Sequence, residues 1–430
     1  MKYTEKLHKL GLTEYPSKKP NITRIKKALK KLKDPQDKFP SIHIAGTNGK
    51  GSTAIFLSEI LRANGYKVGL YTSPHLIKVY ERIKINQINI EEDDFERILK
   101  DMWSLIEKFS LTYFEILTLV AFVYFSERKV DISVIETGLG GKYDATNTIK
   151  NVIASIITPI DFDHTELLGK NIEDIAMEKA GIIKKNTYVV SSGQRKEVEK
   201  IIKKTCESLN CKLFILGKDF NYRFLSCTWS VPEQKFSYFD DKFSYSGICL
   251  KLLGKHQLIN ASVAIKCANL LKNKGYTITE ESIKEALKNA QWPARFQIIN
   301  CNGKKIIIDG AHNPHGSSAL FMALKDSRLK NKSITFVMNV MKEKNYREMI
   351  EILSPLAKEV IIFKSKNPRS VSAEILYSIW QNFMDKKNIK IESDLDKIFR
   401  DIKKEKVVCF TGSLYFAGEV LKFLNEKKLL

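Results

Sequence analysis

The 430-residue sequence lacks an uncharged hydrophobic run long enough to cross a membrane, and it lacks the cysteine spacing of disulfide-rich or zinc-binding proteins. Its longest uncharged runs, such as residues 116–126, fall far short of the ~20 apolar residues that a spanning helix needs. The seven cysteines are odd in number and include no Cys-x-x-Cys pair. No apolar export segment follows the first methionine. We therefore predict a soluble, cytoplasmic protein that has no membrane partner.

The composition is that of a globular protein with a basic surface. Hydrophobic residues make up 43% of the chain and charged residues 28%, and the length suggests two or three domains. The 71 Lys and Arg outnumber the 49 Asp and Glu, so the net charge is +22, which attracts anions. The lysines are dispersed, as in residues 25–33, where helical spacing places them on a solvated face. We interpret them as a lysine-rich surface and predict no nucleic-acid partner.

Short apolar runs alternate with longer amphipathic stretches, which predicts an α/β fold with a mostly parallel sheet wrapped by helices. The predicted strands of this first part are residues 41–45, 67–71, 131–135, 152–158 and 188–191. From about residue 222 to 252, aromatic and polar residues alternate, which indicates a small β insertion.

The segment at residues 291–295, Gln-Trp-Pro-Ala-Arg, interrupts the helical pattern that precedes it. We place a domain boundary there, with a first domain over residues 1–294 and a second, Rossmann-like α/β domain over residues 295–430. The predicted strands of the second domain are residues 304–309, 333–338, 359–363 and 406–410.

A glycine-rich loop joins the strand at residues 41–45 to a helical segment. The loop reads Gly-Thr-Asn-Gly-Lys-Gly-Ser-Thr over residues 46–53. Backbone N–H groups at such a loop can surround phosphate oxygens, while Lys50 adds positive charge and Ser52 offers a hydroxyl to Mg²⁺. The spacing departs from a Walker A loop because Gly51 separates Lys50 from Ser52. The context still predicts a phosphate-binding site.

Three further strands are predicted to end in polar residues at the sheet edge where α/β proteins bind ligands. Glu136 is a candidate magnesium ligand, and the alternative is a carboxylate that caps a glycine turn. His164 follows residues 152–160 and is either a ligand or a structural histidine. His312 and His315 lack a third ligand nearby, so we expect nucleotide or substrate contact there in place of a metal.

The motifs, taken in order, resemble the folylpolyglutamate synthase and dihydrofolate synthase family, a branch of the Mur ligases. They are residues 45–52, 72–76, 136–141, 144–147, 163–164, 178–182, 254–257, 260–261 and 309–314. The resemblance implies ATP-dependent amide formation between a pteroate or folate carboxylate and the amine of L-glutamate, through an acyl phosphate. ADP and phosphate would be released. Two magnesium ions would neutralise the phosphates.

The resemblance also implies roles for individual residues. Gly49, Lys50, Gly51 and Ser52 would hold ATP, and further nucleotide contacts would come from Asn260, Arg295, Asp309 and His312. Ser52, Ser73 and Glu136 would bind one magnesium ion and His164 the other. Lys50, Lys179 and His164 would be catalytic. Lys179 resembles the lysine that is carbamylated in this family, and the alternative is an ordinary helix lysine.

The pterin end of the substrate is marked by two segments. Phe114, Glu115, Asp144 and Ala145 resemble dihydropteroate-contacting residues of bifunctional members, whereas members restricted to polyglutamylation often carry serine in place of Ala145. We therefore predict both activities. The alternative for Phe114 is a position in a helix core. The family usually has glycine where this chain has Ala294, which matters if that position needs a positive φ.

Two other functions remain open. A muramyl-peptide ligase would share the loop and a lysine like Lys179, but residues 72–76 and 144–147 resemble the folate branch. A nucleic-acid-dependent ATPase would use the net charge, but the sequence contains no recognised nucleic-acid motif. We expect a monomer acting on small molecules.

Overall fold

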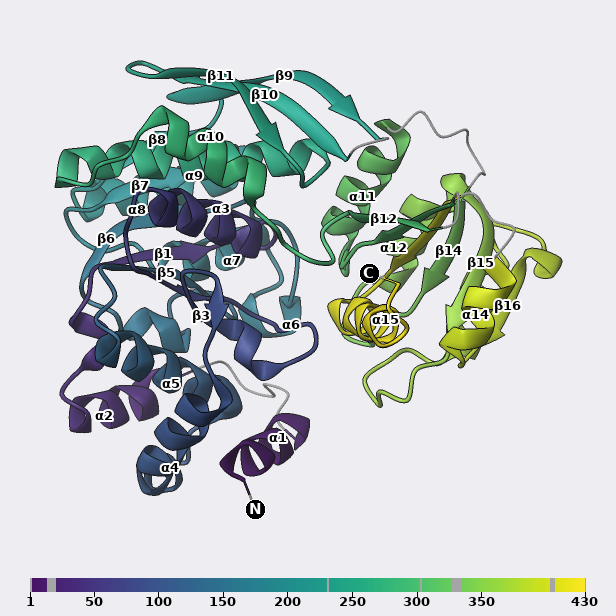
Figure 1. Cartoon of the computed structure of the whole chain (residues 1–430), viewed down its shortest axis with the longest axis horizontal. Helices are drawn as coiled ribbons and strands as arrows, with labels where there is room; N and C mark the ends of the chain where they lie inside the picture. The colour runs from purple at the N-terminus through teal and green to yellow at the C-terminus, as the bar shows by residue number, and fades with distance from the viewer. Residues whose placement is uncertain are drawn as a thin grey trace. The chain divides into compact units, whose positions relative to one another are not determined.

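The computed structural model describes residues 2–13, 21–229, 232–301, 304–326, 334–402 and 407–429. The chain forms two compact units (Figure 1). The first consists of Met1–Leu225, Lys235–Cys249 and Leu258–Ala290, and the second of Ser226–Gln234, Leu250–Gln257 and Gln291–Leu430. The domain boundary predicted after residue 294 stays a prediction.

An eight-stranded sheet forms the centre of the first unit, in the order β4-β3-β2-β5-β1-β6-β7-β8. Neighbouring strands from β2 to β8 pair in parallel, and only β3 and β4 are added antiparallel at one edge. The mostly parallel sheet predicted from the sequence is therefore confirmed. The strands are β1 (Ser41–Ala45), β2 (Val68–Tyr71), β3 (Ile83–Ile85), β4 (Ile88–Asn89), β5 (Ile132–Glu136), β6 (Val152–Ile157), β7 (Tyr188–Ser191) and β8 (Lys212–Ile215).

The helices of the first unit bury apolar faces beside this sheet. The amphipathic helix α4 (Glu92–Phe109) buries Phe95, Leu99, Met102 and Ile106, which recur at helical spacing along one face. In contrast, α5 (Tyr113–Glu127) is apolar on all sides and lies in the core. The others are α1 (Tyr3–Thr13), α2 (Thr23–Lys31), α3 (Lys50–Ala63), α6 (Thr165–Leu168), α7 (Ile172–Ala180), α8 (Lys196–Ser208), α9 (Lys255–Leu271) and α10 (Glu280–Asn289). Short 3₁₀ turns are η1 (Pro35–Asp37), η2 (Val79–Arg82), η3 (Ala145–Thr148) and η4 (Lys272–Lys274).

The predicted β insertion is a separate three-stranded sheet with β10 in the middle. Its strands are β9 (Phe220–Thr228), β10 (Glu233–Asp240) and β11 (Ser244–Leu250). A buried ion pair connects this sheet to α9, because Lys266 Nζ lies 3.0 Å from Asp240 Oδ2. The Tyr238 hydroxyl donates to the same oxygen at 2.6 Å. This pairing stabilises the position of α9, which also carries Asn260.

The second unit is a six-stranded sheet in the order β12-β13-β17-β14-β15-β16, parallel except for the β12–β13 pair. The strands are β12 (Gln297–Cys301), β13 (Lys304–Ile308), β14 (Ile334–Met338), β15 (Ala357–Phe363), β16 (Ile389–Glu392) and β17 (Val407–Thr411). The helical elements are α11 (Pro314–Asp326), α12 (Tyr346–Leu353), η5 (Ser354–Leu356), α13 (Ala373–Trp380), η6 (Lys386–Asn388), α14 (Leu395–Asp401) and α15 (Leu414–Glu426). The second predicted α/β domain is thus confirmed as a fold. Ser333 and Lys406, predicted in strands, lie outside the described residues.

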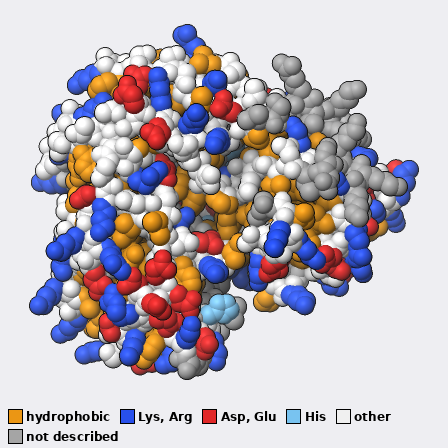
Figure 2. Space-filling view, viewed as in Figure 1, with side chains coloured by type: hydrophobic (Ala, Val, Ile, Leu, Met, Phe, Trp, Pro, Cys, Tyr) orange, Lys and Arg blue, Asp and Glu red, His pale blue; other side chains and the backbone are white. Residues whose placement is uncertain are grey.

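One face of the protein shows the dispersed charge that the sequence predicts (Figure 2). On the face shown in Figure 2, lysine and arginine side chains are scattered and interspersed with acidic ones. Among the helices in the described ranges, none combines the length and apolarity that crossing a bilayer would require.

Candidate functional site

The glycine-rich loop connects the buried central strand β1 to α3. Gly49 stands at the start of α3 with φ of +86°, a left-handed conformation that favours glycine. A Cβ atom at Gly49 would lie 2.4 Å from Asn260 Oδ1, so a side chain at this position would displace the Asn260 amide. Gly51 and Ser52 follow, buried, in the first turn of α3. The structure therefore brings Gly49 and Asn260 together, as expected if both contact one ligand.

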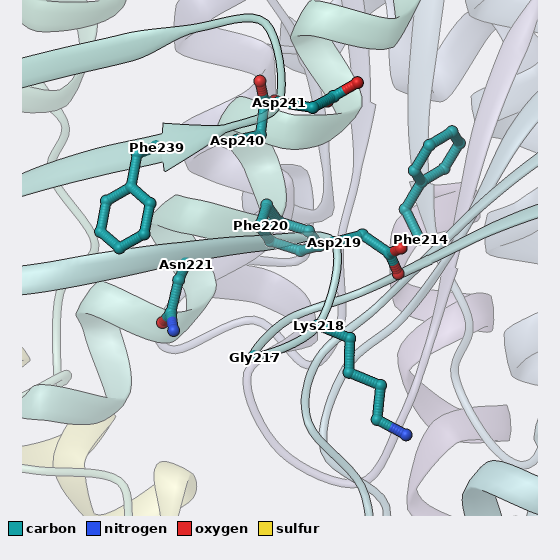
Figure 3. A pocket seen from close by; sticks show the side chains of 9 residues that line it. All are labelled: Phe214, Gly217, Lys218, Asp219, Phe220, Asn221, Phe239, Asp240 and Asp241. Carbon is teal, nitrogen blue, oxygen red and sulfur yellow. The ribbon is translucent and has the colours of Figure 1, made fainter.

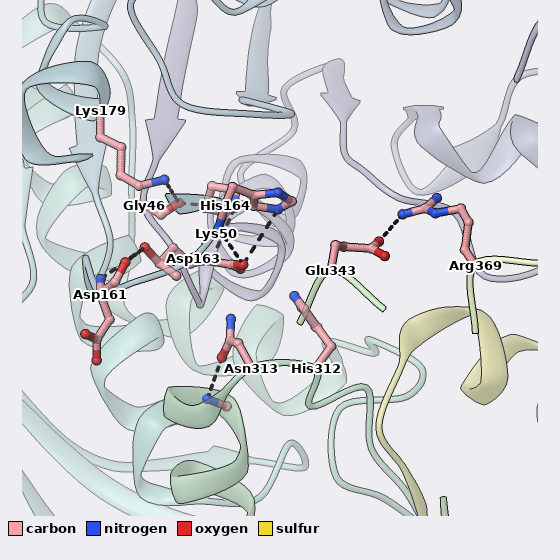
Figure 4. A network of polar contacts seen from close by, with 12 residues as sticks. Gly46, Lys50, Asp161, Asp163, His164, Lys179, His312, Asn313, Glu343 and Arg369 are labelled. Carbon is pink, nitrogen blue, oxygen red and sulfur yellow. Dashed lines mark hydrogen bonds and ion pairs between the residues drawn. The ribbon is translucent and has the colours of Figure 1, made fainter. Parts of the chain in front are cut away.

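Two lysines converge on the loop backbone (Figure 4). Lys50 Nζ donates to the carbonyl oxygens of Gly46 at 3.2 Å and Thr47 at 3.3 Å. Lys179, on α7 and only 5% exposed, donates from Nζ to the same Gly46 oxygen at 2.8 Å. Two ammonium groups therefore meet at a loop whose geometry suits phosphate, which makes the loop strongly attractive to anions.

Strand register places a buried carboxylate beside this loop. Glu136 ends β5 and pairs in register with Ile44 of β1. Its Oε1 atom lies 3.9 Å from Lys50 Nζ, and its Oε2 atom accepts a hydrogen bond from the backbone N–H of Ser73 at 3.0 Å. The segment after β2 therefore meets the end of β5 at the carboxyl edge of the sheet.

The segment after β6 is tied to the loop through Thr47. The Thr47 hydroxyl donates to the Asp161 carbonyl at 2.8 Å and accepts from the Asp161 N–H at 3.0 Å. His164 has φ of +50°, its N–H donates to Asp163 Oδ1 at 2.9 Å, and its Nε2 atom lies 3.8 Å from that oxygen. Thr47 and Asp163 were not among the predicted site residues. The signal for Asp163 was its place, one residue before His164, after a buried strand.

The oxygen donors near the loop suit magnesium only together with a ligand. Across the described ranges, no group of three or more His, Cys, Asp or Glu side chains is arranged to hold a metal ion. The Glu136 carboxylate and the hydroxyls of Ser52 and Ser73 are hard oxygen donors, and Mg²⁺ is commonly bound by one or two carboxylates plus substrate phosphates. These residues therefore fit an ion that arrives with a nucleotide.

The predicted pterin-side residue Phe114 packs against the glycine-rich turn that follows Glu136. A Cβ atom at Gly138 would lie 2.3 Å from Phe114 Cζ, so a larger residue there would displace the ring. The Phe114 ring centroid is 6.0 Å from that of Tyr71. The ring is partly buried at the edge of the main core. Phe114 therefore has the core role that was its alternative, and its contact with the pterin stays a prediction.

Glu115 caps its own helix. Its Oε2 atom accepts hydrogen bonds from the N–H and the hydroxyl of Thr112, both at 2.8 Å, and lies 3.2 Å from Arg24 Nη2. Among the described residues, its buried Oε1 atom has no hydrogen-bond partner. One oxygen of Glu115 is therefore structural, and the other is an acceptor without a donor.

Asp144 organises the turn beside Phe114. Its Oδ2 atom accepts from the N–H groups of Gly138 at 3.0 Å and Leu139 at 2.8 Å, and its Oδ1 atom accepts from the N–H of Thr146 at 3.0 Å. Burial raises the pKa of Asp144, and these hydrogen bonds counteract the shift. Ala145 is buried in the adjoining core. The side chain of Asp144 therefore holds the glycine-rich turn that packs against Phe114.

In the second unit, Asp309 closes a tight turn. It accepts hydrogen bonds from the N–H groups of Phe296 at 2.7 Å and Ala311 at 2.8 Å. Burial raises the pKa of Asp309, while the charge of Arg295 lowers it. Arg295 Nη1 donates to the Ala294 carbonyl at 3.2 Å, and His312 Nδ1 lies 2.9 Å from the Gly310 carbonyl.

Ala294 adopts the conformation that the family's glycine would favour. Its φ is +57°, and its methyl group is fully buried. Its carbonyl accepts from the Gly310 N–H at 2.8 Å, which holds the turn in place. The chain therefore tolerates a left-handed alanine beside Arg295, at a cost of roughly 1–2 kcal/mol relative to glycine.

A cavity of about 490 Å³ lies elsewhere in the first unit (Figure 3). It is lined by Phe214, Gly217, Lys218, Asp219, Phe220, Asn221, Phe239, Asp240 and Asp241. None of the predicted site residues lines it, and its acidic side includes the Asp240 that pairs with Lys266. The candidate site is therefore defined by the loop and its surrounding charges, and not by this cavity.

Two family models match the chain. Residues 44–268 match the Mur ligase middle domain, and residues 294–414 match the Mur ligase, glutamate ligase domain. A Bacillus subtilis protein named dihydrofolate synthase/folylpolyglutamate synthase is 34% identical over 427 residues, covering 95% of each chain.

Solved structures agree over the whole length. Folylpolyglutamate synthase from Thermotoga maritima is 35% identical with a TM-score of 0.85, covering 100% of this chain and 98% of its own. Escherichia coli FolC in complex with DHPP and ADP is 26% identical with a TM-score of 0.88, covering 100% and 99%. The chain therefore belongs to the folylpolyglutamate synthase/dihydrofolate synthase family of Mur ligases.

Proposed function

We propose that this protein is an ATP-dependent ligase that adds L-glutamate to dihydropteroate, forming dihydrofolate, and to reduced folates, forming folylpolyglutamates. The observation that carries the proposal is the convergence of Lys50 and Lys179 on the Gly46 carbonyl, beside the buried Glu136, in a chain of this family. Relatives whose names include both synthase activities support it.

The reaction has two steps. A substrate carboxylate oxygen attacks the γ-phosphorus of ATP, and the bond from that phosphorus to ADP breaks. The glutamate amine then attacks the acyl carbon of the acyl phosphate, phosphate leaves, and the amine nitrogen loses a proton. The first step brings negative groups together, so the ammonium of Lys50 would lower its barrier by offsetting the charge on the phosphates.

The remaining first-unit residues bind and orient. Gly49, Gly51 and Ser52 would offer backbone N–H groups to the phosphates, and Asn260 would contact the nucleotide beside Gly49. When bound, Mg²⁺ would neutralise phosphate charge. Ser52, Ser73 and Glu136 would hold one ion, and His164 would hold a second. Arg295, Asp309 and His312 are proposed as nucleotide contacts from the second unit.

Carbamylation of Lys179 is a separate proposal. The unmodified ammonium donates to Gly46 at 2.8 Å. A carbamate has oxygen acceptors at that end, so the modified side chain would turn from the carbonyl towards a cation. Carbon-13 NMR with labelled bicarbonate would reveal a carbamate signal, which a Lys179→Arg variant should lack. No such signal in active enzyme would contradict the modification.

The pterin wall supports both activities. Phe114, Glu115, Asp144 and Ala145 are proposed to line it, Asp144 by holding the turn and Ala145 by keeping the adjoining core apolar. We infer from Ala145 that dihydropteroate is accepted as well as folate. A monomeric enzyme that acts on small molecules in the cytoplasm remains our expectation.

The test is to incubate purified protein with Mg-ATP and L-glutamate, offering 7,8-dihydropteroate or a reduced folate in parallel, and to identify products by mass while monitoring ADP. Glutamate added to both would support a bifunctional synthase. Addition only to the reduced folate would contradict the interpretation of Ala145. If neither gained glutamate while ATP still bound, the proposed function would be wrong.

A further inference from the structure

Arg82 is a buried cation that has no anionic partner among the residues that the structure describes. It ends η2 and is only 7% exposed. Its Nε atom donates to His75 Nδ1 at 2.9 Å, and its guanidinium carbon lies 5.6 Å from the centre of the Tyr113 ring. Among the described residues, no carboxylate lies within ion-pair distance of it. A buried charge is unfavourable unless it is paired, so this guanidinium is suited to binding an anion.

The two Nη groups of Arg82 are available to such an anion. Both Nη atoms retain contact with solvent. Among the described residues, neither is one of the fully buried side-chain atoms that lack a hydrogen-bond partner. The guanidinium Nε–H can only donate, so His75 Nδ1 is the acceptor of this hydrogen bond. This hydrogen bond orients the guanidinium plane and leaves a two-pronged donor, which matches a carboxylate.

Backbone contacts connect Arg82 to the candidate site. The Thr72 N–H donates to the Arg82 carbonyl at 3.0 Å. The next residue, Ser73, donates its N–H to Glu136 at 3.0 Å. The backbone of Arg82 is therefore bonded to Thr72, the residue before the one that contacts Glu136.

Aromatic residues connect Arg82 to the proposed pterin wall. Tyr113, which it overlies, immediately precedes Phe114. Tyr71 lies close in the sheet, because it pairs in register with Ile83, the residue that follows Arg82. The Tyr71 ring also neighbours that of Phe114. Lys50 and Lys179 already lie at the glycine-rich loop, which leaves Arg82 for a different anion. Its planar guanidinium matches the two oxygens of a carboxylate.

We propose that Arg82 binds a carboxylate of the folate-type substrate and that His75 is a positioning residue that orients it. The inference rests on the proposed function. The carboxylate has two possible sources: the reacting carboxylate, which dihydropteroate and folate both carry, or the α-carboxylate of a glutamyl tail, which only folate carries. The kinetics of the two substrates distinguish these sources.

The test compares Arg82→Gln and Arg82→Lys with Arg97→Gln, a control on α4 whose exposed guanidinium pairs with Asp94 and Glu127. Losing charged hydrogen bonds should raise the KM for the folate-type substrate about 10- to 100-fold. The KM for ATP should change less than about twofold, because a purely structural defect would alter both. A rise for both acceptors identifies the reacting carboxylate, and a rise for folate alone identifies the α-carboxylate.

His75 provides the second measurement. His75→Asn keeps an acceptor near the Nδ1 position and should retain a KM close to that of the wild type, whereas His75→Leu should raise it as Arg82→Lys does. Guanidinium ion added to Arg82→Ala should restore part of the activity.

Unchanged KM values for both acceptors in a folded Arg82→Gln or Arg82→Lys protein would overturn the inference alone. A wild-type enzyme that adds no glutamate to either acceptor would overturn the proposed function as well.

Discussion

Replacing Gly49 with alanine should damage this protein in two separable ways, and Gly65 offers a matched control. Gly49 and Gly65 have almost the same backbone conformation, with φ of +86° and +88°. A Cβ atom at Gly65 would meet nothing within 4 Å, whereas one at Gly49 would lie 2.4 Å from Asn260 Oδ1. The two variants therefore share the left-handed strain and differ in the contact with Asn260.

The magnitudes follow from these geometries. A left-handed alanine costs roughly 1–2 kcal/mol, partly offset by about 0.4–1 kcal/mol of lost freedom in the unfolded chain. Gly65→Ala should therefore destabilise by about 1 kcal/mol. Overpacking adds roughly 1–3 kcal/mol, so Gly49→Ala should destabilise by about 2–4 kcal/mol. In a double-mutant cycle, Asn260→Ala should relieve about 1 kcal/mol or more of the Gly49→Ala defect.

Urea unfolding followed by circular dichroism measures the stabilities, and ADP release measures the activity. Gly65→Ala should keep the wild-type KM for ATP. Gly49→Ala should lose ATP affinity, and combining it with Asn260→Ala should recover stability without recovering that affinity. If Gly49→Ala were no less stable than Gly65→Ala and bound ATP normally, the proposed packing of α9 against the loop would be refuted.

Three further predictions concern charge, pH and backbone strain. Lys50→Ala should lower kcat/KM about 100- to 1000-fold, as expected for a lost electrostatic stabiliser. The control Lys203→Ala removes an exposed ammonium on α8 and should leave steady-state rates unchanged. Full activity in Lys50→Ala would contradict the role assigned to Lys50. Burial lowers the pKa of His43 to about 3. Between pH 6.5 and 3 the unfolded chain therefore binds a proton that the folded chain does not, so the free energy of unfolding should decrease as the pH is lowered. The slope from this group is about 0.7 kcal/mol per pH unit at pH 6.5 and approaches about 1.4 kcal/mol per pH unit near pH 5. Urea unfolding between pH 5 and 6.5 should show a smaller slope in His43→Gln. Ala294→Gly should change stability by less than about 1 kcal/mol, because relief of left-handed strain is offset by unfolded-state entropy and a lost buried methyl; a large loss measured in urea would show that the turn does not strain alanine.

Much of the fold follows from local pattern. The strand at residues 41–45, the glycine-rich loop and the helix after it are contiguous in the chain, so the sequence was enough to predict them. Glu136 could be assigned to a sheet edge for the same reason, since it ends a short apolar run. The strands β3, β4, β8, β12 and β16 were not predicted. In β16, for example, four residues of which two are exposed lie outside any clear alternation.

The roles of several predicted residues depended on their neighbours in space. Glu115 and Asp144 are the kind of acidic residues that bind substrates, yet the structure uses them as a helix cap and as the anchor of a glycine-rich turn. The sequence also did not show whether the backbone at Ala294 has a positive φ, and the structure gives a φ of +57°. Sequence spacing does not reveal which backbone N–H groups will point at a carboxylate.

The sequence alone therefore determined most of the central strands and the chemistry available at their ends, because burial periodicity and glycine turns are local properties of the chain. The tertiary structure decided which groups meet: Lys179 with the Gly46 carbonyl, 133 residues earlier, Asn260 with Gly49, and Arg82 with His75 instead of a carboxylate. The physical reason is that a polar side chain finds its partners through strand order and helix packing, which bring distant segments to one sheet edge and leave no trace in local spacing.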